Sequence, residues 1–389
     1  MTAPPLSGPG LSERSFFFDI VRGVSAQMVV VGHALNVCFP AFFMVDAGTG
    51  VLEARKGLFY AQNLGVLVFF CISGYLVTAS VVRRSTQPGY GLRVYLVDRF
   101  ARIFTPLVPL LLILFVAERA FLGDGTVLRY TVLHLDPATL ALNLTMLFDH
   151  PLMSALSRVT GLSFLKGTVL GTASQLWTVV IEWWIYVTFG LLAFALLRRR
   201  PLRPLLFVAL ALAAVVPAYA LVSGNGLIVA WIAGMLFRLA RESLMRLRKD
   251  VLWTLCIGSG ALLAGALTRN AFDFYAGTIS LLFSVCLLTL YHAVDPGERM
   301  PRPLSLGGFF LGLSTISYSV YLVHLSILFW ILAFAPQLTG KASTFVVLVL
   351  AANAAAVLFY FAFERHYVSV RRFLTRRIAT SPHRGPARS

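Results

Sequence analysis

The chain has 389 residues, of which 58% are hydrophobic and 13% are charged. Soluble domains carry about 25% charged residues, so this composition excludes an ordinary soluble protein and predicts an integral membrane protein. The formal net charge of +17 does not indicate a nucleic-acid partner. The basic residues lie between apolar segments and in the C-terminal tail, as they do in the cytoplasmic loops of membrane proteins.

Ten apolar segments of about 20 residues predict membrane-spanning α-helices rather than the alternating strands of a β-barrel. In chain order, they lie at about 16–38, 59–82, 103–120, 173–197, 204–222, 226–240, 251–268, 274–293, 308–333 and 343–363. No small-residue cleavage site follows the first segment, so we expect it to be retained rather than removed as a signal peptide. The predicted fold is an all-α, polytopic membrane helical bundle of about ten transmembrane helices.

The distribution of basic residues predicts the orientation of the bundle. With the N-terminus in the cytoplasm, most of the 33 Lys and Arg residues fall in inside loops and in the tail, as the positive-inside rule requires. Both termini are then cytoplasmic. We expect residues 1–15 to form a cytoplasmic segment, residues 16–367 the membrane domain, and residues 368–389 a basic cytoplasmic tail that is disordered or bound to anionic lipid.

Residues 121–172 are then a long extracytoplasmic segment within the membrane domain. Its stretch 138–148 is apolar but too short to cross a bilayer, so we expect it to be re-entrant or interfacial.

The first span carries three ionisable residues, Asp19, Arg22 and His33. Such groups are expensive inside a membrane and usually mark function. The spacing of Arg22 and His33 puts them on nearly one helical face, roughly 16 Å apart along the axis, with Asp19 close to that face. Neutral histidine is the usual general base near pH 7, and Asn36, one turn on, is placed to orient the imidazole. A packed structural pair is the alternative.

The fourth span holds Glu182 in its apolar part, at a depth comparable with that of His33. A buried carboxylate needs a partner or stays protonated, and His33, or another cation of the same cavity, supplies one. A structural hydrogen bond to a Trp or Tyr side chain is the alternative. Trp177 is expected in the interfacial belt or in packing, where it can shape an outer cavity.

Arg99 and Arg102 lie at i and i+3 in the loop after the second span, and therefore share one helical face just inside the cytoplasmic surface. Two interpretations stay equally open. The pair either follows the positive-inside rule and does nothing more, or binds phosphate, which a guanidinium group matches with two hydrogen bonds. Within the second span, Ser73 and Gly74 favour close helix approach over irregular backbone along a cavity.

The ninth span contains Tyr318, Tyr321 and His324, with the histidine expected past mid-membrane on the outer side. A core histidine with satisfied hydrogen bonds is the default interpretation. At the inner end of the last span, Glu364 and His366 favour caps or surface pairs over chemistry. The seven histidines are scattered and the four cysteines have no CxxC spacing, so no metal site is predicted.

Together these segments resemble the membrane acyltransferase family 3, the bacterial glycan O-acyltransferases. The resemblance covers nearly the whole chain and is carried by FDIVRGVSAQMVVVGH, LGVLVFFCISGYLVT, RFARIFTP, QLWTVVIEWWIYV, ISYSVYLVHLSIL and FERHY. The most specific motifs are the Arg-x10-His spacing of Arg22 and His33 and the Arg-x2-Arg spacing of Arg99 and Arg102. Some relatives carry an extracytoplasmic hydrolase-like domain, which we do not expect in this chain, and acceptor recognition is therefore expected from the membrane domain and residues 121–172.

The resemblance implies a membrane O-acyltransferase that moves an acyl group from cytoplasmic acyl-CoA to a hydroxyl of an extracytoplasmic or lipid-linked glycan. The enzyme class is that of acyltransferases that transfer groups other than aminoacyl groups. Acetyl is the family default and succinyl the alternative. The implied location is the inner (cytoplasmic) cell membrane. Expected partners are the two substrates, membrane lipids and a protein of the envelope glycan pathway. No tightly bound cofactor is expected, since acyl-CoA is a co-substrate.

The resemblance implies His33 as the catalytic residue, and we expect Glu182 to orient or stabilise its imidazole as the third member of a triad does. Arg99 and Arg102, with Arg22, are expected to bind the acyl-CoA. The residues expected to line the substrate cavity are Asp19, Asn36, Trp177, Tyr318, Tyr321 and His324.

Pantetheine is roughly 15–20 Å long, comparable with the stripe between Arg22 and His33, so the thioester can approach the imidazole. His33 then either deprotonates the hydroxyl or carries the acyl group itself. Two other functions stay open. One is a proton-coupled transporter of a lipid-linked sugar or small anion, which the missing internal repeat disfavours. The other is a non-catalytic partner of a glycan synthase.

Overall fold

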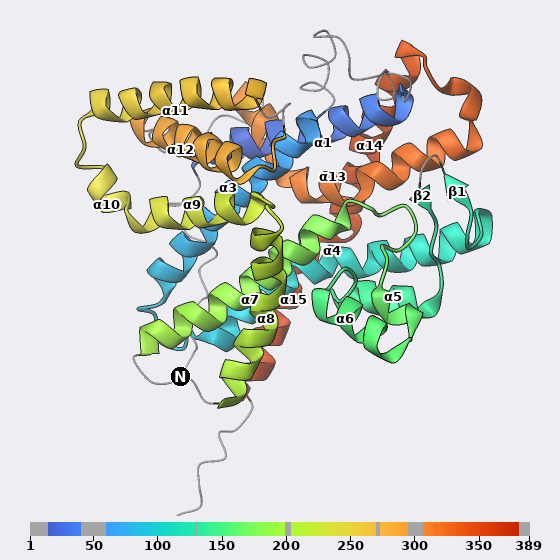
Figure 1. Cartoon of the computed structure of the whole chain (residues 1–389), viewed down its shortest axis with the longest axis horizontal. Coiled ribbons are helices and arrows are strands. Elements are labelled where there is room, and N and C mark those ends of the chain that lie inside the picture. The colour runs from blue at the N-terminus through green and yellow to red at the C-terminus, as the bar shows by residue number, and fades with distance from the viewer. Residues whose placement is uncertain are drawn as a thin grey trace, which may run out of the picture.

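The computed structural model describes residues 15–39, 60–128, 131–198, 204–269, 273–294 and 306–380. In these residues the chain forms a bundle of helices that follows the predicted apolar segments (Figure 1). Among the described helices, nine are long and apolar enough to cross a bilayer. They are α1 (Phe16–Cys38), α3 (Ala61–Arg84), α4 (Leu92–Phe121), α7 (Leu176–Arg198), α8 (Pro204–Val222), α11 (Lys249–Arg269), α12 (Gly277–Val294), α13 (Leu306–Phe334) and α14 (Ala342–Ala362).

Shorter elements connect or cover these long helices. They are the helices α5 (Pro137–Leu144), α6 (Pro151–Thr160), α9 (Leu227–Leu239), α10 (Arg241–Leu244) and α15 (Tyr367–Thr380), and the single 3₁₀ turns η3 (Ser163–Lys166), η4 (Pro336–Leu338) and η5 (Glu364–His366). Strands β1 (Val127–Leu128) and β2 (Thr131–Val132) pair in an antiparallel ladder. The protein is an all-α polytopic membrane bundle, as the composition predicts.

The core of the bundle is built around α1, which packs against both α3 and α13. Small residues permit these close approaches, as they commonly do between membrane helices. A side chain at Gly65 would collide with the Ser25 carbonyl, and one at Gly23 would crowd Leu313 and the Phe310 carbonyl. The ionisable face of α1 is therefore held against two other helices rather than against lipid.

Helix α9 corresponds to the sixth predicted span, residues 226–240, and it is short. Its 13 residues cover about 20 Å, less than the ~30 Å hydrocarbon core. It packs tightly on α3, because a side chain at Gly74 would collide with the Trp231 carbonyl and one at Gly234 with the Cys71 carbonyl. The expectation that Gly74 serves close helix approach is confirmed.

Helix α4 corrects the predicted boundary between a loop and the third span. The span was expected to start at residue 103 after a loop, but α4 begins at Leu92 and runs for 30 residues, about 45 Å. The helix continues beyond the apolar stretch because its polar groups find partners there. Asp98 forms an ion pair with Arg84 at the end of α3 and lies 3.8 Å from Arg371.

In its described residues, the predicted extracytoplasmic segment 121–172 folds into a small cap. Its apolar side chains Leu133, Leu135, Phe148 and Leu170 are completely buried. Thr172 ties the cap to the bundle, because its backbone N–H and hydroxyl donate to the Glu118 carboxylate of α4, which also accepts from Trp330 Nε1 of α13. The apolar stretch 138–148 falls largely in α5, which has eight residues and does not cross the bilayer.

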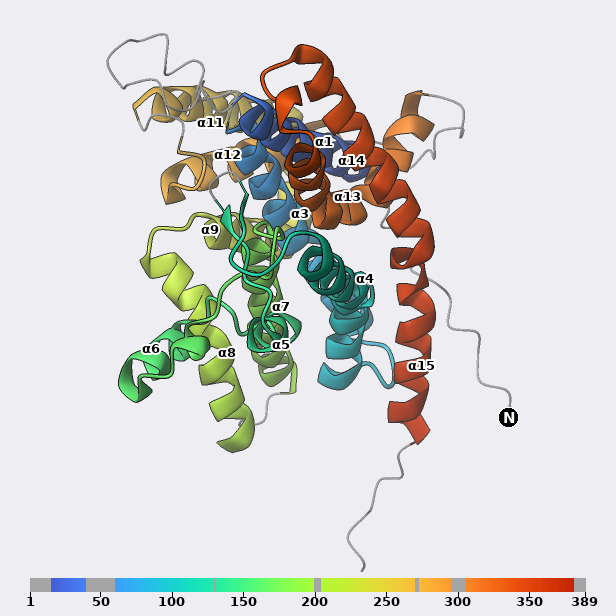
Figure 2. The ribbon, with the colours of Figure 1, turned by 90° about the vertical axis from the view of Figure 1, so that its right-hand side faces the viewer.

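The C-terminal region is ordered further than expected. Residues 368–380 belong to α15, which follows α14 through the turn η5 and packs against α4 (Figure 2). Of the two alternatives for this stretch, disorder is wrong, because Arg371 approaches Asp98 and the Tyr367 ring faces the Arg102 guanidinium of α4; binding to anionic lipid stays a prediction. Residues 381–389 of the predicted tail and residues 1–14 of the predicted N-terminal segment lie outside the described residues.

Candidate active site

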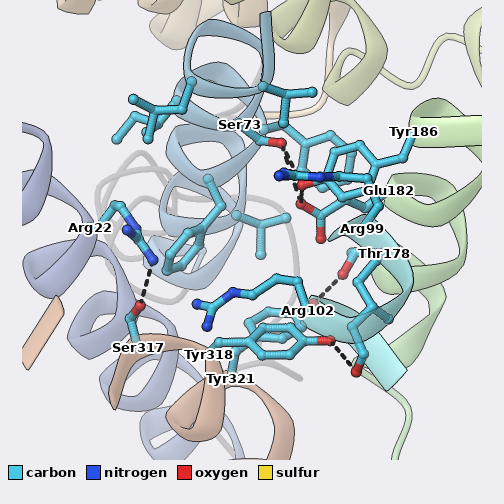
Figure 3. A pocket seen from close by; sticks show the side chains of 17 residues that line it. Arg22, Ser73, Arg99, Arg102, Thr178, Glu182, Tyr186, Ser317, Tyr318 and Tyr321 are labelled. Atoms are coloured by element: carbon cyan, nitrogen blue, oxygen red, sulfur yellow. Dashed lines mark hydrogen bonds between the residues drawn. The ribbon is translucent and has the colours of Figure 1, made fainter. Parts of the chain in front are cut away.

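A cavity of about 190 Å³ lies among α1, α3, α4, α7 and α13 (Figure 3). Its polar lining comes from helices far apart in the sequence, and its apolar lining comes mainly from α3. The polar residues are Arg22, Ser73, Arg99, Arg102, Thr178, Glu182, Tyr186, Ser317, Tyr318 and Tyr321. The structure thus brings together all three predicted arginines, Glu182 and two of the predicted tyrosines.

Arg22 points into this cavity from α1 without a carboxylate partner (Figure 3). Among the described residues its one hydrogen bond is to Ser317 Oγ, at 3.5 Å. Asp19, one turn earlier, instead accepts a hydrogen bond of 3.0 Å from Ser314 Oγ. The positive charge of Arg22 is therefore available to a ligand in the cavity.

Arg99 is also without a carboxylate partner. Its guanidinium carbon lies 5.8 Å from the ring centre of Tyr95 and 5.6 Å from that of Tyr186. No hydrogen bond or ion pair reaches it from the described residues, and its Nε is buried. Aromatic faces attract a cation but do not replace hydrogen-bond acceptors. An anion in the cavity would supply those acceptors.

Arg102, by contrast, is already paired. Its Nη1 lies 2.8 Å from the Glu364 carboxylate, which also accepts hydrogen bonds from the Ser319 backbone N–H and hydroxyl at 2.9 and 2.5 Å. Glu364 therefore forms one of the two arrangements predicted for it, a pair, but Glu364 is fully buried, so the predicted surface location is wrong. The reason is that η5 turns the chain back towards α13 and α4, which a sequence pattern does not reveal.

Glu182 faces the arginines from α7 and takes its hydrogen bonds from neutral groups (Figure 3). It accepts from Ser73 Oγ at 3.3 Å and from the Tyr186 hydroxyl, and those two hydroxyls are 2.9 Å apart. Trp231 Nε1 of α9 donates to the same Ser73 oxygen at 3.3 Å. No hydrogen bond or ion pair joins Glu182 to His33 within the part of the chain that the structure describes.

His33 lies outside the cavity lining, next to His324. The two imidazole centres are 5.2 Å apart. Tyr321, which lines the cavity, lies beside this pair, with its ring centre 6.0 Å from that of His324. The sequence thus predicted both histidines as site residues, but it did not predict that they contact each other.

The remaining predicted residues lie around this site. Tyr318 lines the cavity, and its ring faces the Arg102 guanidinium at 5.5 Å. Trp177 packs edge-on against Tyr275, with ring centres 5.7 Å apart. Asn36 is half-buried on α1, one turn beyond His33. Asn36 and Trp177 are not part of the cavity lining.

Sequence reasoning missed several polar residues of the lining. On α7, Thr178 and Tyr186 flank Glu182 at i−4 and i+4, so the helical period alone places them on its face. Ser73 was assigned to close helix approach in preference to a cavity, and no sequence pattern singled out Ser317. Their roles depend on how α3 and α13 are rotated about their axes, which neighbouring helices decide.

The chain was compared with known families, proteins and structures. A family model described as an acyltransferase domain matches residues 15–363, from the start of α1 to the end of α14. Neither the curated proteins nor the solved structures contain a match. The matched region contains every helix that lines the cavity. The chain therefore belongs to the acyltransferase 3 family and is a multi-pass membrane acyltransferase.

Proposed function

We propose that this acyltransferase moves an acyl group, acetyl by default, from cytoplasmic acyl-CoA to a hydroxyl of an extracytoplasmic or lipid-linked glycan at the inner membrane. The observation that carries the proposal is a membrane-embedded cavity with two guanidinium groups, Arg22 and Arg99, that have no carboxylate partner among the described residues. Buried cations without partners are costly, and a phosphorylated donor supplies the missing negative charge.

Arg99 is the group best suited to hold the donor phosphates. It lies in the half of α4 that extends beyond the apolar stretch, on the side predicted to be cytoplasmic. Arg102, held by Glu364, adds positive charge to the same cavity. Arg22 enters from α1 and would attract the more deeply inserted part of the donor.

The thioester arm would lie along the apolar wall of the cavity. Phe69, Phe70 and Leu76 of α3 contribute to that wall, and their side chains suit the methyl and methylene groups of pantetheine. At the other end, Tyr321 separates the cavity from the histidine pair. The carbonyl carbon of the thioester would therefore reach the neighbourhood of His33 only at the end of the arm.

His33 serves as the general base in the proposed reaction. It takes the proton of the glycan hydroxyl while the hydroxyl oxygen attacks the thioester carbonyl. The C–S bond then breaks, and the departing thiolate takes the proton back from the imidazolium. Glu182 does not orient His33 in this scheme. It instead holds the hydroxyl groups of Ser73 and Tyr186 in the cavity wall.

The proposal is tested by mass spectrometry of the O-acyl groups on envelope and secreted glycans. A deletion strain is complemented with wild type, with His33→Ala, or with His366→Ala as a control, an exposed histidine outside the cavity lining, at matched membrane levels. Loss of one ester mass in the deletion and in His33→Ala, but not in His366→Ala, supports glycan O-acylation and identifies the acyl group. An unchanged ester profile in the deletion strain would exclude the proposed glycan O-acylation.

A further inference from the structure

His324 is an ionisable neighbour of His33. It is completely buried in α13, and its ring centre lies 5.2 Å from that of His33 on α1. Two imidazoles joined by an N–H···N hydrogen bond of about 3 Å have ring centres roughly 5 Å apart. The observed separation therefore suits a hydrogen bond between the rings once the two nitrogens face each other.

The hydrogen bonds of His324 fix its tautomer. Its Nδ1 lies 3.0 Å from the Val320 carbonyl oxygen and 2.9 Å from the Tyr321 carbonyl oxygen. Carbonyl oxygens only accept hydrogen bonds, so Nδ1 carries the proton. In the neutral ring, Nε2 then presents a lone pair.

That Nε2 is buried and has no hydrogen-bond partner among the described residues. A buried acceptor without a donor costs free energy, and native structures rarely keep one without a reason. The nearby Tyr321 hydroxyl is already engaged, since it donates to the Gln175 carbonyl at 2.8 Å and bonds to Thr178. Of the two rings that contact His324 among the described residues, Tyr321 and His33, this leaves His33 with an N–H to donate.

We propose that His324 is a positioning residue for His33, an inference that rests on the proposed acyl transfer. The Nε2 of His324 accepts the N–H of His33, which leaves the other His33 nitrogen as the base for the glycan hydroxyl. When His33 takes that proton, the resulting imidazolium keeps its hydrogen bond to His324. The proton then passes to the thiolate as the C–S bond breaks, and both rings return to the neutral state.

This pair replaces the carboxylate that usually orients a catalytic histidine. Glu182 is committed to Ser73 and Tyr186, and Asp19 accepts from Ser314. A neutral partner also suits this depth in the bilayer, because it adds no second buried charge.

Two substitutions separate the roles of the His324 nitrogens. His324→Gln keeps an acceptor near the position of Nε2, whereas His324→Asn keeps only a group near Nδ1. Both are tested in inverted membrane vesicles with radiolabelled acetyl-CoA, by incorporation of label into the glycan fraction over a range of donor concentrations. Abundance is matched by blot, and thermal stability is measured in detergent.

We expect His324→Gln to keep a maximal rate within about tenfold of wild type, and His324→Asn to lose about 100-fold, as general-base mispositioning does. The KM for acetyl-CoA is expected to stay unchanged in both variants. Equal losses in the two variants, or a faster Asn variant, would overturn the positioning role. If wild-type vesicles transfer no label from acetyl-CoA or, in a parallel assay, succinyl-CoA, the proposed function fails instead.

Discussion

Arg99 and Arg102 lie one turn apart on α4, yet their surroundings give them different tasks. Arg102 has an ion pair with a fully buried carboxylate, whereas Arg99 has aromatic rings and no acceptor among the described residues. Arg102 is tied to the fold, and Arg99 is available to a ligand. Substitutions should therefore separate a binding defect from a stability defect.

Replacing Arg99 by Gln is expected to raise the KM for acetyl-CoA about 10- to 100-fold, because a charge-assisted hydrogen bond is worth about 1.5–3 kcal/mol. Thermal stability in detergent should change little, since no ion pair is lost. The measurement is donor-dependent label incorporation in membrane vesicles. Arg93→Gln, an exposed arginine on the same helix, is the control and should keep the wild-type KM. An unchanged KM in Arg99→Gln would argue against donor phosphates at this residue.

Replacing Glu364 by Ala is expected to destabilise the protein by about 3 kcal/mol, since it leaves the Arg102 charge without its partner. The midpoint of thermal unfolding in detergent should fall clearly. The double variant Arg102→Met with Glu364→Ala should recover part of that loss, because it removes both charges. Equal midpoints for wild type and Glu364→Ala would show that the ion pair contributes nothing to stability.

The sequence was most informative where one helix carries the pattern. Arg22 and His33, or Glu182 and Tyr186, share a face because the helical period is fixed. It was uninformative where a contact joins two helices. The pairing of Glu182 with Ser73, and of His33 with His324, depends on helix rotation, and no single-sequence pattern encodes the rotation of one helix against another.

At the scale of elements, the crossing of α3 and α9 depends on two glycines. A Cβ at Gly74 would fall on the Trp231 carbonyl, which is backbone and cannot move aside cheaply. We expect Gly74→Ala to destabilise the protein by about 1–3 kcal/mol, measured by thermal unfolding in detergent. Gly258→Ala, where nothing lies within 4 Å, should be neutral or slightly stabilising, because alanine favours the helix. A stable Gly74→Ala variant would contradict the close contact.

Helix ends were the least predictable elements. The lengths of the apolar segments located the membrane spans. However, the first part of α4 and all of α15 lie in strongly basic sequence, where hydropathy does not indicate a helix. The Asp98 carboxylate explains the extension, since it lies near arginines of α3 and α15. A buried acidic residue in a basic segment is the sequence feature that would have indicated such packing, because it needs a partner.

At the scale of the whole molecule, the charge distribution predicts that the cap of residues 121–172 and the helix α15 lie on opposite sides of the membrane. A cysteine at the exposed Thr160 position should react with a membrane-impermeant maleimide in intact spheroplasts. A cysteine at the exposed Arg372 position should react only after the membrane is permeabilised. The native cysteines are buried or half-buried, so wild type should give little signal. Labelling of Arg372→Cys in intact spheroplasts would show that the orientation is the opposite of the predicted one.

The composition and the number of apolar segments were sufficient to predict the structural class of the protein. The low charged fraction, the apolar lengths and the ordered motifs predicted a polytopic acyltransferase, and the helices and the family model confirm it. The folding of the cap was not predictable in the same way. Its packing depends on contacts such as Trp184 Nε1 to the Met146 carbonyl at 2.9 Å, which join residues far from each other in sequence.

Tyr321 stands between the arginine-lined cavity and the histidine pair, with its hydroxyl held by Gln175 and Thr178. In the proposed reaction the nucleotide of the donor stays on the cavity side of this ring and the glycan stays on the other side, and only the thioester end of the arm reaches past the ring to His33. The membrane can then remain closed to protons and ions through every turnover. The chemical energy of a cytoplasmic thioester would thereby modify sugars in a compartment that contains no such donor, without a carrier for either substrate and without collapse of the ion gradients.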